Sequence, residues 1–137
     1  MTKRACLVKE KGQELVEFAL LLPLLLALLL GLMEFGIAVF RYNTIANVAR
    51  EVARYSIVHR NDTAAIDAYI ASGLEHWTIG VDPADLEVTV TFEEDPFRPL
   101  VRVVVTYQHH YITAPIIRAV GGNPNLNMQT ESTMYSE

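Results

Sequence analysis

Cysteine and the usual catalytic motifs are scarce in this sequence. A single cysteine, Cys6, stands among 137 residues, so no internal disulfide can form, and we favour an inert thiol over a lipid anchor. There is no G-x-S-x-G, no Gly-rich phosphate loop, no cysteine pair and no histidine pair at helical metal spacing. His109 and His110 are neighbours on an expected strand, where their side chains point to opposite faces. We therefore expect no enzyme, no metal site, no cofactor and no small-molecule substrate.

Positive charge is also scarce outside the first twelve residues. Residues 1–12 carry a net charge of +3, which leaves −8 for the rest of a chain whose net charge is −5. A nucleic-acid-binding domain would show a basic patch, so nucleic acid is not an expected partner, and a basic tail beside a membrane is the better interpretation. The acidic run Glu93-Glu94-Asp95 lacks the ligand spacing of a calcium loop and is interpreted as a solvated hairpin tip.

A long apolar run dominates the amino-terminal third. From Phe18 to Met33 there is no charge, and the apolar segment extends to Phe40 with only Glu34 in between. This exceeds the roughly 20 residues that a spanning helix needs, and the leucines are not confined to one face. The run is too long for a removable secretory signal. Basic residues flank both ends almost equally, so the short basic tail, rather than the charge count, favours a cytoplasmic amino terminus with the domain outside.

Beyond the apolar run the pattern predicts an α+β domain. Residues 41–60 continue the helix with an apolar stripe, and Arg50 and Arg54 on the other face are candidates for contacts with acidic partners. A cap at Asn61-Asp62 precedes a second, shorter helix that ends near Gly80. The stripe consists of Ile45, Val48, Ala49, Val52, Ala53 and Ser56.

Alternation with a period of two follows and predicts a small antiparallel sheet of about three strands. The expected strands cover 86–93, 101–107 and, more weakly, 126–134, with a turn at EEDPFRP between the first two. Residues 112–120 are apolar but contain Pro115 and are assigned no element, and Gly121 to Pro124 form a turn. Such a sheet must bury one face against helices to be stable.

The apolar helix also carries features for packing against other helices. Ala27, Gly31, Glu34 and Ala38 recur at intervals of four and three and share one face, where small residues allow close approach and a carboxylate needs a partner. A simpler alternative is that Glu17 and Glu34, about 25 Å apart along a helix, sit near opposite membrane interfaces.

These residues resemble a known family. A basic stretch, then Gly12-Gln13, then Glu17-Phe18 opening a long apolar helix, is similar to the processing site of type IV pilin precursors of the tight-adherence (Flp) form. The stretches LPLLL, EFG and AREVARY resemble TadE-like proteins of that system. The resemblance covers residues 11–56 and implies a pilin-like fold.

The resemblance also implies a processing event and a docking role. A prepilin peptidase would cut after Gly12, and Glu17 would attract the new amino terminus of a neighbouring subunit's Gln13. Pro23 would loosen the helix for packing into a filament. The partners implied are the membrane, the peptidase and other pilin-like subunits, which would bind through the amino-terminal helix.

Together these features predict a minor pilin or pseudopilin of a Tad/Flp-type pilus or secretion apparatus. The expected organisation is a cytoplasmic leader (1–12), a transmembrane helix (13–40), an amphipathic extension (41–60) and an extracytoplasmic α+β domain (61–137). The expected location is the bacterial inner membrane, with the pilus fibre as a further destination. A bulk filament subunit and a signal-anchored receptor or binding module are the alternatives.

Overall fold

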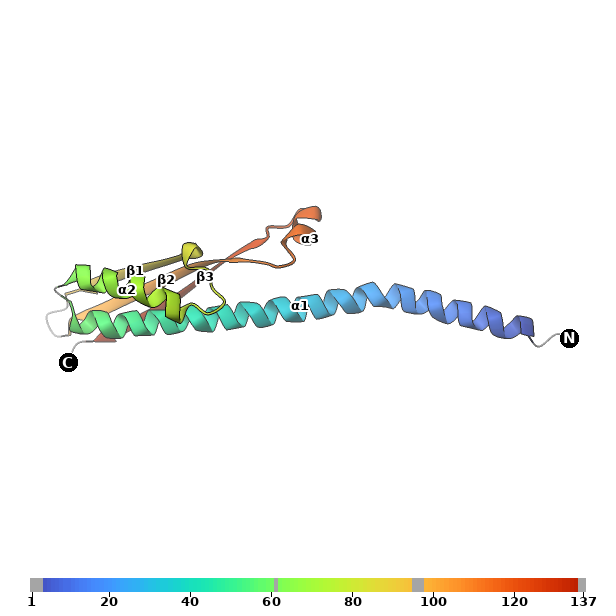
Figure 1. The fold of residues 1–137 in the computed structure, drawn as a ribbon, viewed down its shortest axis with the longest axis horizontal. Coiled ribbons are helices and arrows are strands. Elements are labelled where there is room, and N and C mark those ends of the chain that lie inside the picture. The colour runs from blue at the N-terminus through green and yellow to red at the C-terminus, as the bar shows by residue number, and fades with distance from the viewer. Residues whose placement is uncertain (1–3, 61, 95–97, 136–137) are drawn as a thin grey trace. The chain divides into compact units, whose positions relative to one another are not determined.

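The computed structural model describes residues 4–60, 62–94 and 98–135, with side chains from Gly12 onward (Figure 1). Its elements confirm the α+β class, because a long amino-terminal helix and a shorter helix precede the strands. In chain order they are α1 (Arg4–Val58), α2 (Thr63–Trp77), the 3-10 helix η1 (Pro83–Asp85), β1 (Leu86–Glu93), β2 (Leu100–His110), α3 (Ala114–Ala119) and β3 (Asn125–Tyr135).

The chain divides into two compact units, Met1–Gly36 and Ile37–Glu137, which we call the helical unit and the sheet unit. The described part of the helical unit is α1 alone, which is helical through both Gly12 and Pro23. Leucine is a strong helix former, and its abundance supports an unbroken helix. Proline lacks the N–H that would bond to the carbonyl of Ala19, so the helix has lost one backbone bond there.

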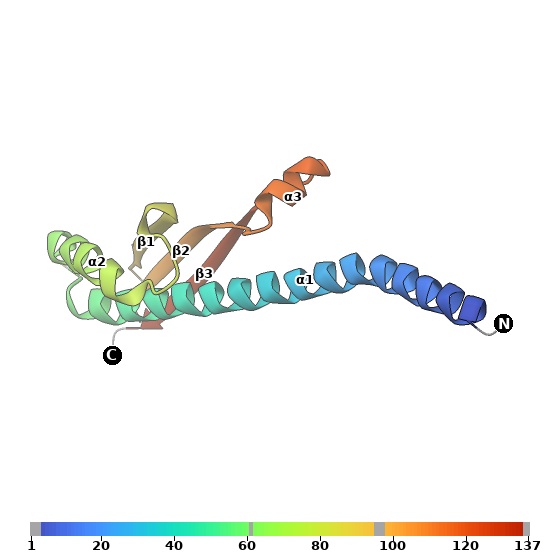
Figure 2. The ribbon, with the colours of Figure 1, turned by 45° about the vertical axis from the view of Figure 1, so that its right-hand side comes forward.

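The sheet unit contains one three-stranded antiparallel sheet with β2 in the middle (Figure 2). Val88 of β1 and Thr130 of β3 both pair with Val105 of β2. Alternate residues of β2 from Val101 to His109 are buried, as the period of two predicts. The third strand follows the same rule from Met128 onward, because Met128 is buried and Thr130, Ser132 and Met134 are half-buried, whereas Leu126 is exposed. Part of the expected hairpin turn, residues 95–97, lies outside the described residues.

The core forms between the second half of α1 and one face of the sheet. Every residue of the predicted stripe on α1, from Ile45 to Ser56, is completely buried. The valines of β2 meet this stripe in one cluster, against which α2 adds Ile70, Leu74 and Trp77. Burying one such aliphatic side chain stabilises a fold by about 1.5–3 kcal/mol, so the stripe fixes α1 onto the sheet. Asp62 caps α2 as predicted, with its carboxylate accepting from the N–H of Ala65 at 2.9 Å.

The short helix α3 was not predicted from the sequence. Pro115 lies in its first turn, where a missing N–H costs no helical bond and the fixed φ of proline suits a helix. The proline therefore starts this helix rather than excluding one. The Gly121 turn that follows is confirmed, with φ at +79°.

Candidate functional site

The predicted processing residues lie on an exposed part of α1. Gly12, Gln13, Glu17 and Phe18 are all exposed, and a Cβ placed on Gly12 would meet no atom within 4 Å. Gln13 and Glu17 are separated by four residues in one helix, so their side chains lie on the same face. Nothing within the described chain shields this face from a peptidase or a neighbouring subunit.

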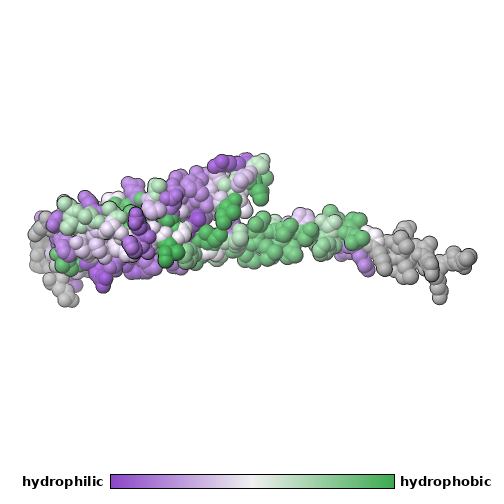
Figure 3. Space-filling view, viewed as in Figure 1, coloured by the Kyte–Doolittle hydropathy of each residue, from purple (hydrophilic) through white to green (hydrophobic). Residues whose placement is uncertain are grey.

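The apolar segment of the helical unit is exposed in the described part of the chain. In the described residues one helix is long and apolar enough to cross a membrane, and none of its most apolar eighteen-residue window is buried (Figure 3). A shallow hollow of about 660 Å³ on this segment is lined only by apolar side chains between Phe18 and Leu28. Such a surface is stable only against lipid or other apolar helices.

The small-residue face divides into an open part and a covered part. Ala27 and Gly31 are exposed, and a Cβ on Gly31 would meet no atom within 4 Å, so another helix can approach closely there. Glu34 is only 7% exposed. Ala38 packs partly against the core of the sheet unit.

Arg50 and Arg54 lie on the exposed side of α1 and line an open groove. Arg50 donates to the side-chain oxygen of Asn47, and Arg54 forms a 2.8 Å ion pair with Glu51. Tyr69 of α2 donates its hydroxyl to the same carboxylate at 2.9 Å. Hydrogen bonds from Arg54 and then Tyr69 lower the pKa of Glu51, whereas burial and the bond to Glu51 raise the pKa of Tyr69. The groove encloses about 480 Å³ and is also lined by Trp77 and Met134.

An aromatic stack beside this groove was not found from the sequence. The rings of Tyr55 and Tyr69 are parallel with centroids 3.8 Å apart, and His59 stacks on the other side of Tyr55 at 4.1 Å. Trp77 tilts against Tyr69 at 5.0 Å. The spacing of four between Tyr55 and His59 gives half of the stack in the sequence, but the partner ring from α2 becomes adjacent only in the tertiary structure.

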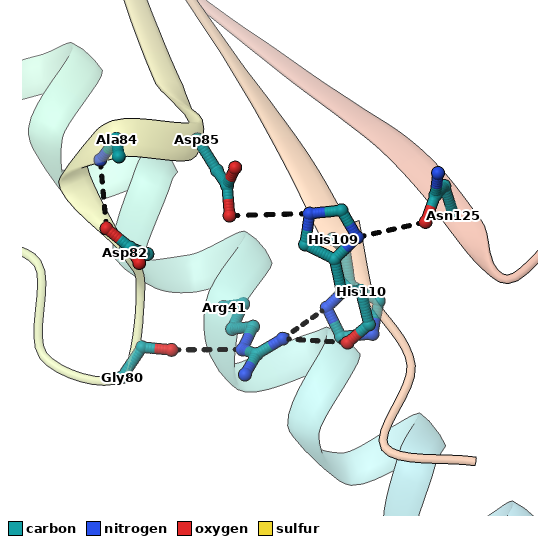
Figure 4. Close-up of polar contacts among 8 residues, drawn as sticks. All are labelled: Arg41, Gly80, Asp82, Ala84, Asp85, His109, His110 and Asn125. Carbon is teal, nitrogen blue, oxygen red and sulfur yellow. Dashed lines mark hydrogen bonds and ion pairs between the residues drawn. The ribbon is translucent and has the colours of Figure 1, made fainter. Parts of the chain in front are cut away.

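A second cluster missed by the sequence analysis surrounds Arg41 (Figure 4). Its Nε donates to the carbonyl of Gly80 at 2.9 Å, and its Nη1 lies 2.8 Å from Nδ1 of His109 and 3.3 Å from the carbonyl of His110. A guanidinium can only donate, so Nδ1 of His109 accepts and the imidazole is neutral, with its proton on Nε2. Arg41 thereby joins α1 to the segment after α2 and to the end of β2.

The two histidines of β2 lie on opposite faces, as the alternation predicts. His109 is completely buried, while His110 is half-exposed, bonds to Asn125 at 2.9 Å and lies 3.4 Å from Asp85. Among the described residues no three histidine, cysteine or acidic side chains are grouped closely enough to hold a metal ion. Two signals in the sequence could have drawn attention to these residues. Arg41 is the first charged residue after the apolar run, and His109 occupies the same alternate positions of the strand as the inward-facing valines.

The fold and the exposed apolar helix define an α+β protein with a pilin-like layout, in which one long helix supplies both the core of a small domain and an apolar extension. Residues 12–54 match the family model described as TadE-like protein, which confirms the resemblance that the sequence shows over residues 11–56. Comparison with curated proteins and with solved structures finds no match. The family match indicates a component associated with a Tad pilus system, and the apolar helix indicates that it associates with a membrane.

Proposed function

We propose that the chain is a minor pilin or pseudopilin of a Tad/Flp-type pilus, processed after Gly12 and assembled through its amino-terminal helix. The observation that carries this proposal is the division of α1 into two surfaces. The apolar window in its amino-terminal half is entirely uncovered, while the stripe in its carboxy-terminal half is completely buried in the sheet unit. A helix that only anchored a domain would need no glutamate five residues after a glycine and no small-residue face.

Docking of subunits follows from the electrostatics of Glu17. A carboxylate that enters an apolar helix bundle is costly unless an opposite charge meets it, and a free amino group at Gln13 of a neighbouring subunit supplies that charge. Exposure of the Gln13 and Glu17 face leaves this contact open between copies. The role is structural, and it places the amino terminus in the cytoplasm and the sheet unit outside the inner membrane.

The processing step is tested by amino-terminal mass spectrometry of membrane-purified protein. We expect a mature chain that begins at Gln13 in cells with an active prepilin peptidase. The variant Gly12→Val should accumulate as a full-length precursor, because a branched side chain takes the place of the hydrogen atom at the cut site. Gly36→Ala, at another exposed glycine of α1, is the matched control and should be processed normally. An intact Met1 in the wild-type protein would contradict the proposal.

A binding module is the second candidate, and the groove beside Arg50 and Arg54 favours it. Two cations, a stacked aromatic row and an open volume of about 480 Å³ could receive an acidic segment of another protein. In a pilus this surface would bind a neighbouring subunit, so the two functions are compatible. Loss of assembly in an Arg50→Glu, Arg54→Glu variant with normal membrane abundance would support it.

A further inference from the structure

A polar stripe follows the exposed side of α1 within the sheet unit, opposite the buried core stripe. Its members recur at intervals of four, three and four, and all are exposed: Asn43, Asn47, Arg50 and Arg54, which we call the basic stripe. Glu51 lies beside the stripe, and its carboxylate already accepts hydrogen bonds from Arg54 and from Tyr69. With Glu51 included, this side of α1 has a net charge of +1 (2 minus 1).

The face of the sheet that points away from α1, which we call the acidic face, has the opposite sign. Its residues alternate along each strand with those that face the core, and the charged side chains of the strands on it are Glu87, Glu93, Arg102 and Glu131. Three carboxylates and one guanidinium give a net charge of −2 (1 minus 3). The sheet unit therefore carries one basic and one acidic surface.

One guanidinium holds two of these carboxylates in place. Nε of Arg102 lies 3.3 Å from Oε1 of Glu93, and its Nη1 lies 2.7 Å from Oε1 of Glu131. The side chains of Glu93 and Glu131 remain 49% and 47% exposed. An ionised carboxylate accepts several hydrogen bonds, and two carboxylates that share one cation keep one uncompensated negative charge. A further guanidinium from outside the chain therefore meets positioned and accessible acceptors on this face.

The two surfaces lie on opposite sides of the sheet unit. The core stripe of α1 packs against the inner face of the sheet, so the basic stripe, on the other side of the helix, points away from the sheet. The acidic face points away from the helix. The back of one copy thus complements the front of another in charge, and such complementarity selects the surfaces that meet. A contact between two different surfaces of identical chains is heterologous, so it can continue from copy to copy.

We propose that the sheet units of neighbouring copies stack front to back, with the basic stripe of one copy on the acidic face of the next. This inference rests on the proposed function and deepens it, because it names the acidic surface that Arg50 and Arg54 meet in a pilus. Exposed ion pairs are individually weak, but copies whose amino-terminal helices are packed together have a high effective concentration. A helix lying on a sheet also repeats the layer arrangement inside the unit.

The contact is tested by crosslinking the full-length protein in phosphatidylcholine vesicles, whose lipid has no net charge. In a Cys6→Ser background, one preparation carries Asn47→Cys in the basic stripe. A second carries Thr91→Cys, which pairs with Arg102 on the acidic face. The two are mixed in equal amounts and treated with a short bismaleimide. We expect the mixed product to exceed both products between like copies several-fold.

A matched control excludes random collision. Ala71→Cys, at an exposed position of α2, takes the place of Thr91→Cys and should give several-fold less product with Asn47→Cys. Equal yields at positions 71 and 91 would contradict the proposal. A dominant product between two Asn47→Cys copies, or between two Thr91→Cys copies, would show a two-fold contact and would also overturn it.

Dependence on charge is tested first by salt. Raising the ionic strength from about 0.01 M to about 1 M shortens the Debye length from about 30 Å to about 3 Å, so the yield of mixed product should fall several-fold. A yield that does not respond to salt would refute the contact as described. This measurement needs no charge substitution, so it decides the case even where a charge variant fails to fold.

Charge inversion supplies the second test of charge. Glu93→Arg, Arg102→Glu and Glu131→Arg together invert the acidic face and keep its internal ion pairs, and they should abolish crosslinking to the unchanged stripe. Arg50→Glu and Arg54→Glu in the other copy should restore the product with the inverted face. With folding verified by Trp77 fluorescence, a product that is not restored would count against stacking.

Failure of stacking and failure of processing are separate results. The contact lies wholly within the sheet unit, so the same mixed product is expected in the Gly12→Val background. Its absence in that background alone would overturn the inference. Absence of the mixed product in a chain that begins at Gln13 would overturn stacking and leave the processing proposal standing.

Discussion

Removing the Arg41 side chain should destabilise the sheet unit more than removing the exposed side chain of Arg50 or Arg54. Arg41→Gln shortens the side chain and removes the guanidinium group. The nitrogens of that group lie 2.9 Å from the carbonyl oxygen of Gly80, 2.8 Å from Nδ1 of His109 and 3.3 Å from the carbonyl oxygen of His110. A hydrogen bond contributes about 1 kcal/mol net, and an acceptor left unsatisfied in a buried site costs about 1–3 kcal/mol. Since His109 is completely buried, we expect a loss of about 3 kcal/mol in the free energy of unfolding.

The assay uses the only tryptophan of the chain. Trp77 packs against the core, so its fluorescence should follow unfolding of the sheet unit in denaturant with the full-length protein in detergent micelles. Arg50→Gln is the matched control, because Arg50 is exposed and bonds only one turn away, to Asn47, and its loss should cost less than about 0.5 kcal/mol. If both variants lose the same stability, the three bonds of Arg41 do not hold the segments together.

Two further predictions concern charges on α1. Glu17→Gln should leave the membrane abundance of the protein normal or higher and should abolish pilus assembly, as measured by electron microscopy and surface adhesion. Glu34→Gln should have a milder effect on assembly. Normal pili in the Glu17→Gln strain would refute docking through Glu17. The pKa of Glu51 is lowered by its bonds to Arg54 and Tyr69, so their stabilising effect is complete above the ordinary value of 4.5 and is lost as the pH falls through the lower folded pKa. Tyr69→Phe should therefore cost about 1 kcal/mol at pH 7 and less in acid, measured by Trp77 fluorescence, and an equal cost at both pH values would contradict this.

The sequence alone predicted the features that depend on periodicity. An apolar run without a polar face can only be accommodated in lipid or against other helices, and a stripe at intervals of three and four must face a core. The stripe from Ile45 to Ser56 is therefore the best predicted part of the fold, and the structure buries every member of it. The alternation of apolar and polar residues likewise predicted which strand residues face the core, and it predicted that His109 and His110 lie on opposite faces of the sheet.

Prediction was weaker where a local signal has two meanings. Pro115 was taken to interrupt an apolar stretch, although in the first turn of a helix proline is well accommodated, and α3 was therefore missed. The small-residue face was predicted as one surface. The packing of Ala38 against the sheet unit was not visible in the spacing, because periodicity gives the side of a helix and not what covers it.

The remaining features depend on contacts between residues far apart in the chain. Arg41 and His109 are 68 residues apart, and Tyr69 meets Glu51 across 18, so no local pattern could pair them. These contacts form because the stripe of α1 packs on the inner face of β2, which brings the polar ends of both elements within hydrogen-bonding distance. The sequence by itself thus determined which residues form the exposed apolar segment of α1 and which enter the core. Only the tertiary structure decided which polar groups meet at the edges of that core, because their partners are chosen by packing rather than by spacing.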